Sequence, residues 1–227
     1  MHSSVITFPG SNCDRDMDVA LKKFGFKNKM VWHGDIELPK SDLVVLPGGF
    51  SYGDYLRCGS MASKSKIMKS VINFARGGGK VMGICNGFQI LVEAGLLPGV
   101  LLRNKYLEFI CKNVFVKVNN KDNSYFKDIK RDTFEFHIAH NEGNYFCSKE
   151  QIKQIDDNNQ IALSYSDESG NINEENNPNG SIKNIAGIFN KEKNVLGMMP
   201  HPERMIDPAL SGEDGSIFFE NLINNLK

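Results

Sequence analysis

Short strand-like runs alternate with amphipathic segments along the first half of this chain. Such runs occupy residues 5–8, 29–32 and 43–46, and another leads up to Cys85. Between and after them, apolar residues recur at helical spacing, at Met17, Ala20, Leu21, Phe24, Ile67, Val71, Ile72, Ala75, Phe88, Ile90, Leu91 and Ala94. Strands that alternate with helices are typical of parallel sheets covered on both faces. We therefore predict an α/β fold, a mostly parallel, flavodoxin-like sheet flanked by helices.

The middle of the chain has a different pattern. In residues 114–118 valines alternate with Phe115 and Lys117, a period of two that predicts antiparallel strands. Two further apolar runs, at 185–190 and 195–198, predict a hairpin. We expect these antiparallel strands to extend the sheet at one edge.

The remaining segments are shorter or more polar. Ser148 and Gln151 have the spacing of a capping box, which predicts a short helix after them. Residues 167–181 are rich in Asn, Glu, Gly and Ser and predict an exposed loop. A last helix is expected over roughly 216–226. No internal repeat or long linker divides the chain, so residues 1–227 are predicted to form a single domain.

Composition narrows the class of protein. The formal net charge is zero, which gives no electrostatic reason to expect nucleic acid or a membrane as partner. No apolar run approaches membrane-spanning length, and a strand is predicted close to the N-terminus, so we expect neither a membrane span nor a signal peptide. The five cysteines are an odd number without C-x-x-C spacing. This set favours a reducing cytoplasm over disulfides or structural zinc, and we expect no metal.

Cys85 stands where a strand would turn sharply into a helix. Glycines lie two positions to either side of it, in a G-x-C-x-G pattern at 83–87. Glycine tolerates the close backbone approach that such a turn requires, and a helix N-terminus favours a thiolate above it. The pattern predicts a nucleophile elbow that carries cysteine. Taken alone, the cysteine is more often a small buried hydrophobe.

A histidine and a glutamate stand two residues apart near the C-terminus, at His201 and Glu203. The prolines at 200 and 202 favour extended backbone in the residues before them, which would turn both side chains to the same side. A carboxylate so placed can fix the tautomer of a catalytic histidine. The alternative is a solvated loop in which Glu203 pairs with Arg204 or a lysine. The elbow favours the catalytic interpretation, with Cys85, His201 and Glu203 as nucleophile, base and orienting acid.

The strand at 43–46 breaks into Pro-Gly-Gly at 47–49. Glycines let backbone N–H groups come close to a ligand, and acyl transfer needs such donors for its oxyanion. We predict an oxyanion hole formed by the N–H groups of Gly49 and Asn86. A simple strand-ending turn is the alternative. The carboxyl ends of parallel strands are where open α/β sheets place their sites, which favours the functional interpretation.

These three motifs, Gly-Ile-Cys-Asn-Gly-Phe-Gln, Pro-Gly-Gly-Phe-Ser and Pro-His-Pro-Glu-Arg, together resemble class I (triad) glutamine amidotransferases. Further motifs at 8–14, 51–59 and 176–181 resemble one branch of that class, the glutaminase subunits of phosphoribosylformylglycinamidine synthase in purine synthesis. The resemblance spans essentially the whole chain. It implies that Gln89, His140 and Gly143 bind glutamine. One departure is Asn141, where the family usually has glycine in Ala-His-Gly-Glu-Gly.

The resemblance also implies a divided reaction. This chain would hydrolyse L-glutamine through a Cys85 thioester and pass ammonia to a separate synthetase subunit, with a small bridging subunit in the same complex. The sequence holds no G-x-x-x-x-G-K-[ST] motif. We therefore expect no cofactor in this chain, and ATP and magnesium on the synthetase, which would convert formylglycinamide ribonucleotide to formylglycinamidine ribonucleotide.

Two other classes of protein stay open at this point. One is a different Cys-His-Glu hydrolase, a peptidase or γ-glutamyl hydrolase. The other is a non-catalytic redox module in which Cys85 is only oxidised. Cys13 and Cys58 are rival nucleophiles in glycine-containing loops. His33 and His137 are expected to be structural.

Overall fold

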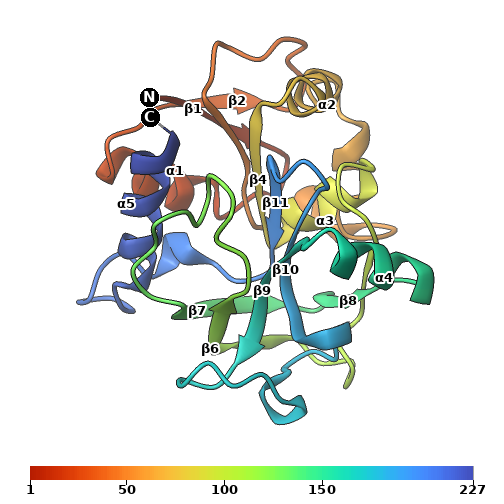
Figure 1. Ribbon diagram of the computed structural model, residues 1–227. Coiled ribbons are helices and arrows are strands. Elements are labelled where there is room, and N and C mark those ends of the chain that lie inside the picture. The colour runs from red at the N-terminus through yellow and green to blue at the C-terminus, as the bar shows by residue number, and fades with distance from the viewer. Residues whose placement is uncertain (227) are drawn as a thin grey trace.

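A nine-stranded sheet with helices on both faces forms the body of the protein, whose residues 1–226 are described by a computed structural model (Figure 1). The strand order across the sheet is β2-β1-β3-β4-β11-β10-β9-β6-β7. The strands of this sheet are β1 His2–Thr7, β2 Lys27–Trp32, β3 Leu43–Leu46, β4 Lys80–Ile84, β6 Ile110–Val118, β7 Thr133–His140, β9 Ile161–Ser166, β10 Ile185–Phe189 and β11 Val195–Met198. Two short strands, β5 Val100–Leu102 and β8 Asn144–Phe146, pair separately.

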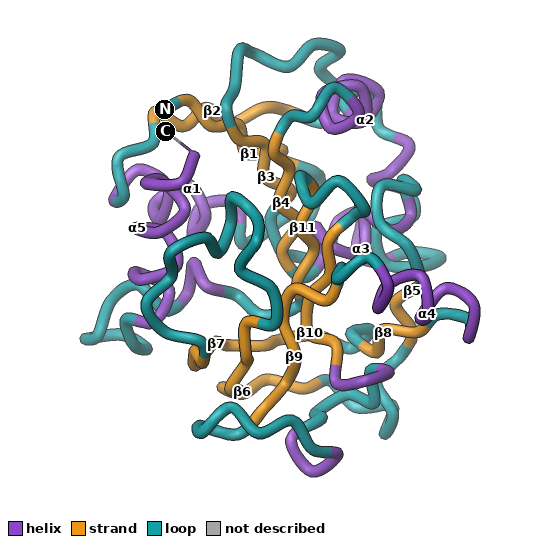
Figure 2. The backbone as a smooth tube through the Cα atoms, viewed as in Figure 1, coloured by secondary structure: helices purple, strands orange, loops and turns teal. Residues whose placement is uncertain are grey.

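One half of the sheet is parallel and the other is antiparallel. Strands β2, β1, β3, β4 and β11 run parallel to their neighbours. Strands β10, β9, β6 and β7 continue the sheet (Figure 2). Their pairings are antiparallel. The predicted α/β class is confirmed, and so is the antiparallel extension at one edge. The alternation in β6 is also confirmed, because Val114, Val116 and Val118 are buried.

Five helices of the described residues pack around the sheet. They are α1 Asp14–Lys23, α2 Met68–Arg76, α3 Asn86–Glu93, α4 Lys149–Asp157 and α5 Asp214–Leu226. Helices α1 and α5 lie on one side of the sheet, and α2 and α3 lie on the other, against β4 (Figure 1). Ser148 and Gln151 form the predicted capping box at the start of α4. Within residues 1–226, no helix combines the length and apolar character needed to cross a membrane.

The loop at 167–181 corrects one prediction. Its first part is largely exposed, but Asn179 is 0% exposed and Ser181 only 2%. Asn179 Nδ2 donates hydrogen bonds to the carbonyl of Gly143 and to the hydroxyl of Tyr165. The predicted exposed loop is therefore wrong at its C-terminal end, because polar residues there are satisfied by partners that are distant in sequence.

The parallel half of the sheet brings four loops to one edge. Strands β1, β3, β4 and β11 point the same way, so the residues that follow them meet at their carboxyl ends. These are the segments around Cys13, Gly49, Cys85 and His201. Chain direction alone thus assembles the predicted site.

Candidate active site

Cys85 is the single residue between β4 and α3, in a strained conformation. Its φ is 50° and its ψ is −106°, a region that costs a non-glycine residue about 1–3 kcal/mol. Its backbone N–H donates to the carbonyl of Met198 on β11, at 2.7 Å. A Cβ on Gly87 would lie 1.9 Å from the carbonyl oxygen of Leu46, and one on Gly83 2.6 Å from that of Gly87. The predicted elbow is confirmed, and both flanking glycines are required by close backbone contacts.

His201 and Glu203 form a buried pair at the end of β11. His201 Nδ1 lies 2.6 Å from Glu203 Oε1, and the two side chains are 1% and 0% exposed. The backbone N–H of His201 donates to the carbonyl of His137 on β7, at 2.8 Å. His201 has φ −105° and ψ 88°, and residues Pro202–Arg204 form a 3₁₀ turn. The predicted pairing is therefore confirmed, whereas the predicted extended path is wrong: the turn, with Pro202 at its start, brings the carboxylate to the imidazole.

The electrostatics of the pair favour a protonated imidazole. Burial acts to lower the pKa of His201, but the charge of Glu203 and the neighbouring Cys85 outweigh it and raise this pKa to about 10. Nδ1 is engaged by Glu203. His201 Nε2 has no hydrogen-bond partner among residues 1–226, although it is buried. The imidazole therefore keeps one N–H free for a reacting group beside Cys85.

Gly49 and Asn86 are the two residues predicted to form the oxyanion hole. Gly49 has φ 137°, and a Cβ there would lie 2.7 Å from the backbone nitrogen of Asn12. A Cβ on the preceding Gly48 would lie 2.5 Å from His201 Cε1, so this loop touches the imidazole of His201. Asn86 is the first residue of α3, so its N–H has no acceptor within that helix. Their role as donors to the negative oxygen of a tetrahedral intermediate stays a prediction.

Replacing Gly49 by alanine is expected to lower kcat for glutamine hydrolysis by about 10²–10³-fold, the usual loss for one oxyanion donor. The added Cβ meets backbone atoms of Ser11 and Asn12, so the loop must move. Gly78→Ala is the matched control, because Gly78 also has positive φ but nothing lies within 4 Å of its Cβ position. Steady-state glutamate release measures both variants. Equal activity of the two would remove Gly49 from the oxyanion hole.

Gln89 is buried in a network of amides under the site. Its Oε1 accepts from Asn86 Nδ2 at 2.9 Å, and its Nε2 donates to the carbonyl of Glu142 at 2.7 Å. Asn86 Oδ1 in turn accepts from the backbone N–H of Ser51 at 3.1 Å. The network links the elbow helix to the oxyanion loop and to the segment 140–143. Gln89 is thus no solvent-facing amide.

His140 and Gly143 share one hydrogen-bond partner, Asn104, which no sequence motif indicated. Asn104 Oδ1 lies 3.1 Å from His140 Nδ1 and accepts from the N–H of Gly143 at 3.0 Å. Asn104 Nδ2 donates to the carbonyls of Glu108 and His140, which fixes the amide orientation. His140 Nδ1 therefore carries the proton. Burial lowers the pKa of His140 to about 3, so this imidazole is neutral.

Because Nδ1 of His140 carries the proton, its Nε2 is a buried hydrogen-bond acceptor. His140 Nε2 is deprotonated and has no partner in the part of the chain that the structure describes. Asn179 is a second asparagine whose role was not predicted from the sequence. Its Nδ2 donates a hydrogen bond to the Gly143 carbonyl at 2.8 Å. Asn141 does not adopt positive φ, and its carbonyl accepts from the N–H of Asn104. The backbone thus tolerates asparagine where the family usually has glycine.

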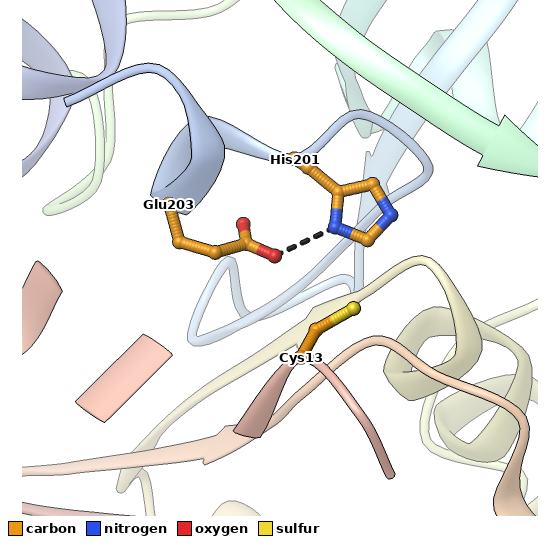
Figure 3. A group of neighbouring side chains, drawn as sticks. All are labelled: Cys13, His201 and Glu203. Atoms are coloured by element: carbon orange, nitrogen blue, oxygen red, sulfur yellow. Dashed lines mark hydrogen bonds and ion pairs between the residues drawn. The ribbon is translucent and has the colours of Figure 1, made fainter. Parts of the chain in front are cut away.

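Cys13 lies directly beside the His201–Glu203 pair (Figure 3). Arg204 Nη2 donates to its sulfur at 2.9 Å. Burial, with the charge of Glu203, raises the pKa of Cys13 to about 12 against the effect of Arg204. Burial and the carboxylates of Asp54 and Glu142 likewise raise the pKa of Cys58. Both thiols are held protonated, which disfavours them as rival nucleophiles.

The same three side chains, Cys13, His201 and Glu203, place one ligand atom each within 4.8 Å of one another. That spacing could hold a metal ion. Each of the three already has a partner, since Glu203 binds His201 and Arg204 binds Cys13. The expectation that the chain uses no metal stays a prediction.

A strained cysteine over a helix N-terminus, served by a buried histidine–glutamate pair at the carboxyl ends of a parallel sheet, defines the class of triad glutamine amidotransferases. Comparison with known families agrees. The sequence model of the CobB/CobQ-like glutamine amidotransferase domain matches residues 1–212, and the chain belongs to that family.

Individual proteins similar to this chain have more specific names than the family. A curated protein of Pelagibacter ubique (strain HTCC1062), named phosphoribosylformylglycinamidine synthase subunit PurQ, is 88% identical over 100% of both chains. The PurQ of Zymomonas mobilis is 49% identical over 98% of each. Among solved structures, PurLQS from Thermotoga maritima contains a chain with TM-score 0.87 and 40% identity, covering 100% of this chain and 99% of that one. A putative GMP synthase subunit from Thermoplasma acidophilum, at TM-score 0.63 and 17% identity, shares the fold.

Proposed function

We propose that this chain is the glutaminase subunit of phosphoribosylformylglycinamidine synthase. The observation on which the proposal rests is that a curated protein named as this subunit is 88% identical to the chain over its full length. The strained Cys85 and the buried His201–Glu203 pair agree with that name. The reaction is hydrolysis of L-glutamine to glutamate and ammonia. The ammonia then serves the synthetase subunit, which converts formylglycinamide ribonucleotide to formylglycinamidine ribonucleotide.

In the first half of the reaction, the Cys85 thiolate attacks the carboxamide carbon of glutamine while His201 is protonated. The carbonyl π electrons move to oxygen, which accepts hydrogen bonds from the N–H groups of Gly49 and Asn86. The tetrahedral intermediate then collapses and the C–N bond breaks. The raised pKa of His201 suits it to protonate the departing ammonia. A γ-glutamyl thioester remains on Cys85.

In the second half, His201 is neutral after giving up its proton. It takes a proton from water, and the resulting hydroxide attacks the thioester carbon. The C–S bond breaks, glutamate leaves, and the Cys85 thiolate and the protonated His201 are restored. Gln89, His140 and Gly143 are proposed to hold the substrate, and the unpartnered Nε2 of His140 supports this proposal.

Partner subunits are needed for the ATP-dependent synthetase reaction, because this chain supplies no phosphate-binding motif. We place ATP and magnesium on the synthetase, and we place the complex in the cytoplasm, which the scattered reduced cysteines favour. The PurLQS structure of T. maritima supports a synthetase and a small subunit as partners. We assign no cofactor to the chain itself.

Exposed apolar side chains beside the oxyanion loop favour docking there. Tyr55 and Leu56 are 70% and 82% exposed, and Leu56 also adopts positive φ. Phe50 lies 6.3 Å from Phe109, ring centre to ring centre, so a second exposed segment at 106–109 lies next to this loop. A partner bound to residues 50–59 and 106–109 could adjust the loop that carries Gly49.

The alternatives lose support. A peptidase or γ-glutamyl hydrolase would act alone, whereas the relatives are named as subunits of a synthase. A redox module needs no carboxylate bonded to a histidine at 2.6 Å.

We expect glutamine hydrolysis by the isolated chain to be slow and to rise on the order of tenfold or more in the complete complex with ATP and formylglycinamide ribonucleotide. Leu56→Ser is expected to weaken this stimulation. Leu210→Ser is the matched control, because Leu210 is 83% exposed but lies in the loop before α5. Coupled glutamate assays give both rates. Rapid turnover by the isolated chain, unchanged by the other subunits, would argue for an independent hydrolase.

A further inference from the structure

A second cysteine–histidine pair lies outside the catalytic centre, on the antiparallel half of the sheet. Cys111 Sγ is 3.5 Å from His137 Nε2, and His137 Nδ1 is 3.2 Å from Asn113 Oδ1. The three residues come from adjacent strands, Cys111 and Asn113 from β6 and His137 from β7. Asn113 stands opposite His137 in the register, and Cys111 opposite Ala139. Alternation along both strands turns all three side chains to the same face.

The hydrogen bonds define the tautomer of His137. Asn113 Nδ2 donates to Glu135 Oε1 at 3.4 Å, so the asparagine presents its oxygen to His137. Nδ1 of His137 therefore carries the proton, and Nε2 is the acceptor that faces the thiol of Cys111. Partial burial, with the nearby charges of Arg204 and His201, lowers the pKa of His137 against the opposing effect of Glu203. The imidazole is neutral and can accept a proton.

Cys111 is also the cysteine that a reagent reaches first. Cys13, Cys58, Cys85 and Cys147 are buried, whereas Cys111 is exposed. It lines a groove of about 1360 Å³ between segments 104–112 and 173–184. The charged residues that line the same groove are balanced in sign: Lys105, Lys112, Lys183, Glu108, Glu174 and Glu175. Such a groove has room for a small peptide.

We propose that Cys111 is a modification site that reacts with low-molecular-weight peptide disulfides, with His137 as its base and Asn113 as the positioning residue. The Cys111 proton passes to His137 Nε2, and the thiolate attacks one sulfur of the disulfide. A new S–S bond joins Cys111 to one half of the reagent. The old S–S bond breaks, and the leaving thiolate takes the proton back from His137. The reagent is the oxidant, and a free thiol reverses the reaction.

Oxidised glutathione is the probe that tests this site, applied to the full chain carrying Cys85→Ala so that the elbow thiol cannot contribute. Intact mass and peptide mapping follow the adduct. We expect one adduct, at Cys111, forming about tenfold faster or more than in the same chain with His137→Gln. Asn113→Ala should give an intermediate rate, and Cys111→Ser no adduct. Circular dichroism confirms that each variant is folded.

A comparison that needs no histidine variant uses N-acetylcysteine at the same pH. Cys111 should react faster than this free thiol. Equal rates for Cys111 and N-acetylcysteine, equal rates with and without His137, or an adduct mainly at another cysteine would each overturn the proposal.

Discussion

Replacing Cys85 by alanine will abolish glutamine hydrolysis, with kcat falling by about 10⁴–10⁶-fold, as expected for loss of the nucleophile from a triad. The remaining thiols cannot substitute. Burial holds Cys13 and Cys58 protonated, and Cys111 lies on the outer part of the sheet with His137. The measurement is glutamate release by the complete complex.

Two controls separate lost chemistry from lost structure. The complex with Cys85→Ala should still make formylglycinamidine ribonucleotide when ammonium salt replaces glutamine, since the synthetase reaction does not need the thiol. Cys147→Ala should keep glutamine-dependent activity, because Cys147 is equally buried but follows β8, away from the elbow. If Cys58→Ala abolished hydrolysis while Cys85→Ala did not, the elbow would not carry the nucleophile.

The parts of the site that could be predicted from sequence depend on short-range backbone constraints. The elbow follows from two glycines around a cysteine, because the strand before it and the helix after it leave the chain a single sharp turn. The meeting of Cys85, Gly49 and His201 follows from parallel strands, whose carboxyl ends share an edge. The pairing of His201 with Glu203 needed only their two-residue spacing, even though a 3₁₀ turn, not an extended path, brings them together.

The parts that could not be predicted depend on contacts between distant segments. Asn104 fixes the tautomer of His140 across 36 residues, and Asn179 holds Gly143 across another 36. An asparagine in a polar loop has no local signal that separates a buried role from an exposed one. The contact between Cys111 and His137 could not be predicted for the same reason. The two residues are 26 positions apart and meet only through the register of β6 and β7. Periodicity identified the strands but not their alignment.

Replacing Glu203 by glutamine is expected to lower kcat by about 10²–10⁴-fold and to change the pH dependence of the reaction. In the native protein, burial disfavours the imidazolium, and Glu203 with Cys85 reverses that preference and raises the pKa of His201 to about 10. Without the carboxylate the burial effect gains weight, so the pKa of His201 falls. A raised pKa keeps the proton on His201 as the pH increases, and a lowered pKa loses it earlier.

The sign of the pH effect follows. His201 must carry a proton when ammonia leaves, so the Glu203→Gln variant should lose more activity at pH 8 than at pH 6, and its residual kcat should rise as the pH falls. The native enzyme should lack this rise, because His201 stays protonated throughout that range. Glu192→Gln, at an exposed glutamate in the β10–β11 turn, is the control and should keep the native profile. A Glu203→Gln profile parallel to the native one would mean that the carboxylate only orients the imidazole and does not set its protonation.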